Sequence, residues 1–81
     1  MQLIPINEND LMSILFYLSK ENNMPKATKD IAYWHGFDVE YTMAHILFLV
    51  MQESVAVHSF GYKYINAESM YWQLTGTTNY N

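Results

Sequence analysis

The chain has 81 residues, and its net charge of −4 comes from eight acidic side chains against four lysines and no arginine. This length gives room for one domain, and 51% hydrophobic with 15% charged residues predicts a folded core rather than disorder. No cysteine is present and no apolar run is long enough to span a membrane, so disulfides, cysteine-ligated metal and membrane partners are excluded and we expect a cytoplasmic protein.

Residues 1–6 are expected to be an N-terminal extension, because Pro5 and the lack of basic residues do not fit a signal peptide. A first helix is predicted over about residues 7–22. Asn7 caps its exposed amides, and Leu3 or Ile4 is expected to staple the extension onto the first turn. An apolar stripe with helical spacing follows, formed by Leu11, Ile14, Leu15 and Leu18. Pro25 prevents the helix from continuing.

Two shorter helices are predicted next, joined by a glycine turn. Thr28 opens a helix that ends at Gly36, and Asp38 caps a third helix over about residues 39–53. Two helices joined by so short a turn are typical of a helix-turn-helix. We expect Trp34 to fill the core beneath the turn.

After Ser54 the apolar period changes from helical to alternating, which predicts two antiparallel strands. The first strand places Val55, Val57 and Ser59 on one face, and the second places Met70, Trp72 and Leu74 on one face. The stretch 60–69 is the expected hairpin loop, or wing, and residues 76–81 are an expected flexible tail. The domain therefore covers residues 7–75.

Three segments of this domain resemble the winged helix-turn-helix family, and most of all the small transcriptional regulators of fimbrial operons. They are Thr28-Lys29-Asp30-Ile31-Ala32 followed by Gly36, Thr42-Met43-Ala44-His45-Ile46 with Leu49, and Tyr71-Trp72-Gln73-Leu74-Thr75. The resemblance implies an α+β fold in which three helices are followed by a two-stranded antiparallel β-hairpin, the wing. It also implies that the third helix enters the major groove of DNA while the wing contacts phosphates.

Carried over by position, the resemblance predicts a set of DNA- or partner-binding residues on the second helix, the third helix and the wing. They are Lys26, Lys29, His35, Val39, Glu40, Tyr41, Ala44, His45, Tyr62, Lys63 and Tyr64. The charge of this set is unusual for a DNA reader, because it has no arginine, a single lysine in the wing, and Glu40 where phosphates would pass.

The third helix is apolar on every side over residues 46–51. One small core covers one side of a helix only, so Leu47, Phe48 and Met51 are expected to pack on a partner protein or a second copy.

Two functions follow from these observations. The first is a small transcriptional regulator that binds duplex DNA through its third helix and wing, as a dimer or with a partner; the helix-turn-helix residues favour it. The alternative is an acidic protein-interaction module that does not bind DNA, like phage- or plasmid-encoded inhibitors of nucleic-acid-binding proteins; the charge favours it.

Other classes of function have no support in the sequence. The spacing of His35, His45 and His58 matches no metal-ligand motif, so we expect no metal site. No catalytic triad, phosphate loop or carboxylate pair appears. We therefore expect neither an enzyme nor a cofactor or small-molecule ligand.

Overall fold

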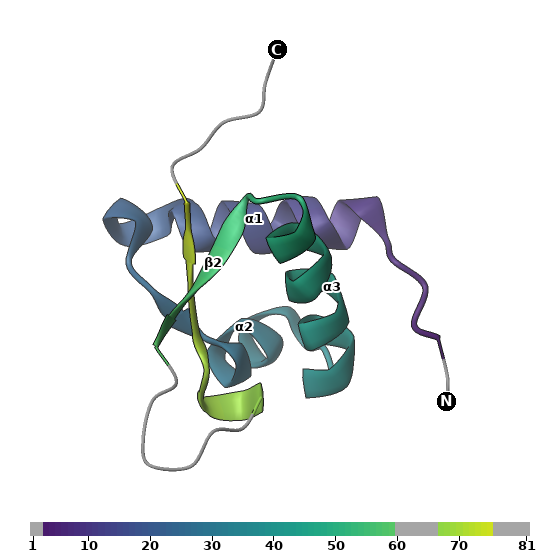
Figure 1. Cartoon of the computed structure of the whole chain (residues 1–81). Helices are drawn as coiled ribbons and strands as arrows, with labels where there is room; N and C mark the ends of the chain where they lie inside the picture. The colour runs from purple at the N-terminus through teal and green to yellow at the C-terminus, as the bar shows by residue number, and fades with distance from the viewer. Residues whose placement is uncertain (1–2, 60–66, 76–81) are drawn as a thin grey trace.

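The computed structural model describes residues 3–59 and 67–75, which form an α+β fold (Figure 1). The elements in chain order are α1 (Glu8–Asn23), β1 (Lys26–Ala27), α2 (Thr28–His35), α3 (Val39–Met51), β2 (Val55–Ser59), the 3-10 helix η1 (Ala67–Ser69) and β3 (Tyr71–Leu74). The predicted class, three helices followed by a hairpin, is therefore confirmed at the level of α+β. Within the described ranges, no helix has the length and apolarity needed to cross a membrane.

Helix α1 begins as predicted but loses helical geometry early. The amide of Asp10 donates to Oδ1 of Asn7 at 3.1 Å, which is the expected cap. Ile6, rather than Leu3 or Ile4, lies directly before the cap and packs against the core, the position of a hydrophobic staple. The backbone leaves the helix at Lys20, and the next three residues, 21–23, all have positive φ.

The turn between α2 and α3 depends on Gly36. This residue adopts φ 71° and its amide donates to the carbonyls of Ala32 and Tyr33, which ends α2 as expected. Helix α3 is two residues shorter at its C-terminus than predicted. Asp38 is its N-cap residue but its side chain makes no cap hydrogen bond; instead, Oγ1 of Thr42 donates to the Asp38 carbonyl at 3.0 Å.

The sheet of the described residues has three antiparallel strands in the order β1-β3-β2, one more than predicted. Strands β2 and β3 form the expected hairpin, in which Val57 pairs with Trp72. The additional strand, β1, pairs Lys26 with Trp72 and Ala27 with Tyr71. With only two residues, β1 carries no alternating pattern that a sequence can reveal, and its pairing places the start of α2 against the middle strand.

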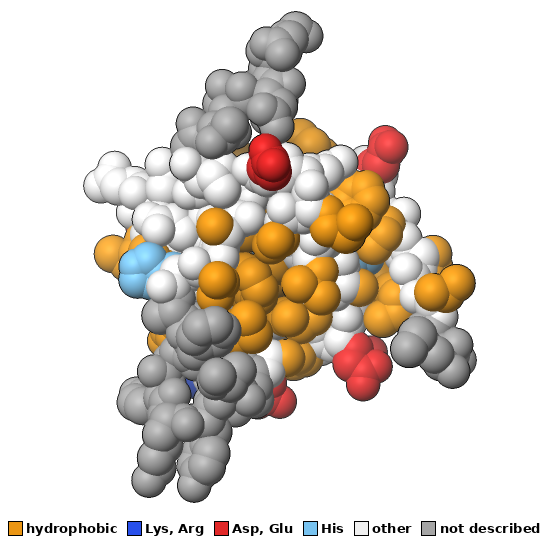
Figure 2. Space-filling view, in the orientation of Figure 1, with side chains coloured by type: hydrophobic (Ala, Val, Ile, Leu, Met, Phe, Trp, Pro, Cys, Tyr) orange, Lys and Arg blue, Asp and Glu red, His pale blue; other side chains and the backbone are white. Residues whose placement is uncertain are grey.

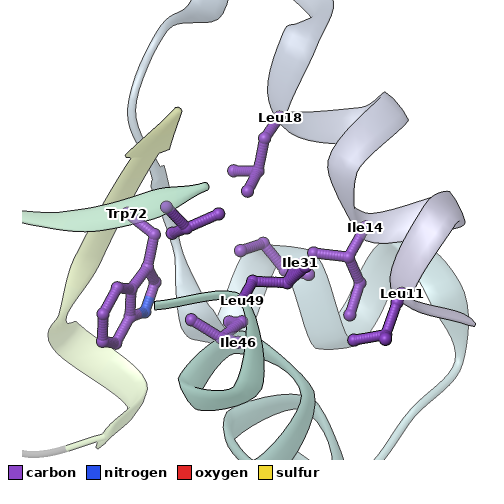
Figure 3. Close-up of a cluster of buried hydrophobic side chains, with 8 residues drawn as sticks. Leu11, Ile14, Leu18, Ile31, Ile46, Leu49 and Trp72 are labelled. Carbon is purple, nitrogen blue, oxygen red and sulfur yellow. The ribbon is translucent and has the colours of Figure 1, made fainter. Parts of the chain in front are cut away.

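The core lies where the helices meet the hairpin (Figure 3). All three helices and both hairpin strands contribute to its buried cluster, which consists of Leu11, Ile14, Leu18, Ile31, Ile46, Leu49, Val55 and Trp72. Trp72 is 2% exposed, and its indole Nε1 donates to Oγ1 of the fully buried Thr28 at 2.7 Å.

The expectation that Trp34 fills the core is wrong, because Trp34 is 63% exposed. On α2 the inward positions are taken by Ile31 and Ala32, which follow Thr28 at helical spacing, and Trp34 lies on the other side. Phe37 packs against the core after the turn. Trp72 is the tryptophan of the core.

Replacing Gly36 with alanine should destabilise the protein by about 1 kcal/mol, since L-residues disfavour this left-handed conformation. An added Cβ would meet no atom within 4 Å, so the loss of stability would come from the backbone conformation and not from a steric clash. Gly36→Asn should cost less, because asparagine tolerates positive φ. Urea unfolding of the three proteins measures the difference. Equal stability of Gly36→Ala and wild type would contradict the assigned conformation.

Thr28→Val should destabilise the fold by about 1–3 kcal/mol, because it leaves the buried indole N–H of Trp72 without an acceptor. In Trp72→Phe that donor is absent, so adding Thr28→Val should cost markedly less than it does in wild type. Thr42→Val is the matched control. Thr42 is equally buried but bonds to the Asp38 carbonyl, so its effect should simply add to that of Trp72→Phe. Additive effects for the Thr28 pair would exclude the coupling.

Candidate interaction surface

The outward side of α3 carries a stripe of residues spaced by three and four positions: Glu40, Ala44, Leu47 and Met51. We call this stripe the α3 outer face. It lies opposite the buried side of the helix, which is formed by Thr42, His45, Ile46 and Leu49. Leu47 is 47% exposed and Met51 is 83% exposed. With Phe48 at 36%, the three residues expected at an interface are all exposed in the single chain.

Hydrophobic side chains gather over the part of the molecule that carries α3, with acidic side chains around them (Figure 2). The sequence explains the charge pattern, because residues 39–51 contain one charged side chain, Glu40, and no lysine. Contiguous patches of exposed apolar side chains mark sites of contact with other molecules.

A groove of about 410 Å³ lies beside this stripe, between α1 and α3. We call it the α1–α3 groove, and its lining residues are Ile6, Glu8, Leu11, Met12, Leu15, Phe48, Leu49 and Gln52. Met12 is 62% exposed and Phe48 is 36% exposed, so both present apolar surface to solvent. Because Phe48 follows Ala44 by four positions and precedes Met51 by three, its side chain adjoins the α3 outer face, and the groove borders that face.

His45 is expected to face a binding partner, but it is completely buried. Its Nδ1 lies 2.8 Å from the Tyr41 carbonyl oxygen, and its Nε2 accepts the Asn7 amide at 3.0 Å. These partners place the ring proton on Nδ1, because Nε2 must be an acceptor. His45 joins α3 to the start of α1 and is not available to a ligand.

Tyr41 and Val39 are half-buried near the start of α3. The Tyr41 hydroxyl donates to the Asp10 carboxylate of α1. This hydrogen bond raises the pKa of the Tyr41 phenol, and burial and the negative charge of Asp10 raise that pKa further. Tyr41 thus joins α3 to α1 beside Glu40, the acidic residue of the α3 outer face.

Lys26 is also buried, at 7% exposure, so the expectation that it meets phosphate is corrected. Its ammonium donates to the carbonyls of Met24 at 3.1 Å and Lys20 at 3.4 Å, and it lies 5.2 Å from the Tyr17 ring centroid. Both carbonyls can accept from Lys26 because the backbone leaves helical geometry at Lys20. Lys29 remains exposed on α2, whereas Tyr62, Lys63 and Tyr64 lie outside the described residues.

A continuous row of rings crosses the three helices, and no pattern in the sequence predicts it. Neighbouring centroids are between 4.2 and 5.7 Å apart along Trp34, Tyr17, His35, Phe37, Tyr41 and His45. His35, a predicted contact residue, is half-buried in this row, and its Nδ1 lies 2.7 Å from the Ile31 carbonyl oxygen. The row combines residues from different helices, so no local spacing reveals it.

No family model, curated protein or solved structure matched the chain. Among the described residues, no group of three or more histidine, cysteine or acidic side chains is placed to hold a metal ion. The surface residues themselves therefore supply the functional argument.

Alkaline titration should show that Tyr41 ionises above the ordinary value of 10.0. Because its folded pKa is raised, the Tyr41–Asp10 contact stabilises the fold fully below the unfolded pKa and loses that effect as pH rises through the folded value. The difference in phenolate absorbance between wild type and Tyr41→Phe isolates this group. Asp10→Asn should shift the isolated titration downwards; an unchanged curve would contradict the assigned cause.

Proposed function

We propose that this protein is an acidic interaction module of winged-helix type, which binds a partner protein through the α3 outer face and does not itself bind duplex DNA. The observation that carries the proposal is the composition of that face. Where a recognition helix would present cations to DNA, α3 presents Ala44, the exposed Leu47 and Met51, and the acidic Glu40.

DNA and a partner protein would gain different free energies of binding from the α3 outer face. DNA binding derives much of its free energy from neutralising phosphates, and Glu40 would oppose it. Burying exposed apolar side chains is favourable on any protein surface, by about 1.5–3 kcal/mol for a fully covered leucine or methionine. Leu47 and Met51 therefore support a protein partner.

Two of the three lysines in the described ranges make contacts within the fold. Lys26 is committed to backbone carbonyls. Lys20 lies over the rings of Phe16 and Trp34, at 5.2 and 5.6 Å from their centroids. Of the three lysines in the described ranges, Lys29 on α2 makes neither kind of contact, whereas Lys63 lies outside those ranges. One exposed cation on the helix pair gives a weak hold on DNA.

The winged-helix part of the proposal is supported by the order of the elements. Helices α2 and α3 are joined by the Gly36 turn, and an antiparallel hairpin follows. The third strand, β1, is compatible with this arrangement. The pair α2 and α3 also favours a second candidate function, a DNA-binding regulator that acts as a dimer or with a partner.

Photo-crosslinking discriminates between the two functions. A benzophenone amino acid at position 47 should yield a protein adduct in the source cell, whereas the same group at Tyr33 should not. Tyr33 is 88% exposed on α2, outside the α3 outer face, and is the matched control.

In parallel, fluorescence anisotropy on mixed-sequence duplex DNA should show no saturable binding even at low salt, where counterion release helps most. Saturable DNA binding that salt abolishes, without a protein adduct at position 47, would overturn the proposal in favour of the regulator.

A further inference from the structure

We infer that the α1–α3 groove receives the apolar face of a basic amphipathic helix that belongs to the partner protein. This inference rests on the proposed function and deepens it by naming the chemistry of the partner. Three features of the groove carry it: its apolar lining, the helical backbone of its two walls, and the sign of the charges around it.

The lining suits an apolar helix face. Leu11, Leu15 and Leu49 lie at the inner side of the groove, while Met12 and Phe48 present exposed apolar surface along it. Methionine adapts to irregular apolar partners because its side chain is unbranched and polarizable. A helix would insert residues spaced at i, i+3, i+4 and i+7 between such walls.

The walls also favour a helix over an extended peptide. Both walls are helices, whose backbone groups are largely bonded within α1 and α3 themselves. An extended peptide would bury its own amides and carbonyls there without backbone partners, which is unfavourable. A helix satisfies its backbone internally and brings only side chains to the groove.

The surrounding charges select a cationic partner. Glu8 lines the groove, and Asp10 lies at the contact of α1 with Tyr41 of α3. Glu40 is exposed in the first turn of α3, and Glu53 is exposed just beyond its end. Neither residues 8–19 of α1 nor residues 39–51 of α3 include a lysine. Lysine or arginine flanking the apolar face of a helix would complement these acids.

The same charges oppose a second copy of the chain as occupant. A symmetric dimer places identical surfaces together, so the acids of one groove would approach those of the other. Like charges brought together in this way are unfavourable at an interface. A basic helix gains the apolar contacts without this repulsion.

The probe for this inference is a fluorescently labelled synthetic peptide. Its leucines recur at i, i+3, i+4 and i+7, so that they form one face of a helix, and lysines occupy the opposite face. We expect saturable anisotropy with the full-length protein. A peptide of the same composition in scrambled order should bind at least about tenfold more weakly, because it cannot present one apolar face. A peptide with glutamate in place of lysine should also bind more weakly.

Substitutions locate the site. Met12→Asp should weaken binding of the leucine–lysine peptide at least about tenfold, although the added acid increases general attraction for a cation. Tyr33→Asp adds the same charge at an exposed position on α2 and should not weaken binding. Glu8→Lys should weaken binding most at low salt. Circular dichroism checks that each variant stays folded.

Three outcomes would overturn the inference: no saturable binding of the amphipathic peptide, equal loss in Met12→Asp and Tyr33→Asp, or sedimentation showing a dimer that Met12→Asp dissociates. If the peptide fails while the crosslinker at position 47 still captures a protein, the groove inference falls and the proposed function stands. If both fail, both are wrong.

Discussion

Thr28 holds the helical part of the protein against the sheet, and the position of the interaction surface depends on this contact. Its backbone amide donates to the Met70 carbonyl at 2.9 Å, and its hydroxyl accepts the Trp72 indole N–H at 2.7 Å. Thr28 is the first residue of α2, whereas Trp72 lies in the middle strand β3. The start of α2 is thereby fixed, and the Gly36 turn then sets where α3 begins. The outward side of α3 follows from that placement.

The sequence predicts those parts of the fold that depend on neighbours along the chain. The Asn7 cap and the Gly36 turn could be identified because their signals lie within one turn of a helix. Strand β1 could not, since two residues show no period. Nor could the core tryptophan be chosen, because Trp34 and Trp72 both occur in apolar surroundings. The Thr28 hydroxyl, 44 residues from Trp72, decides between them.

The candidate site shows the same limit. Six consecutive apolar residues, 46–51, cover every side of a helix, so exposure of Leu47 and Met51 could be predicted from the sequence alone. The burial of His45 could not, because it depends on the Asn7 amide, 38 residues away. The α1–α3 groove likewise requires knowing how two helices pack. Local pattern predicts which side chains are apolar; packing decides which of them reach solvent.

Lysines and acidic side chains have different roles in this protein. Lysines at the end of α1 and in β1 contact carbonyls and rings of the chain itself, so they stabilise the fold rather than a complex. The acids Glu8 and Glu40 lie on the helices that form the groove and the α3 outer face. In a complex of the proposed kind, these acids would accelerate the encounter with a basic partner, an effect that salt screens. Leu47, Met12 and Phe48 would then set the lifetime of the complex, because burial of apolar surface acts mainly on dissociation. Salt should therefore change the association rate of this protein more than its dissociation rate, whereas loss of an apolar side chain should do the reverse.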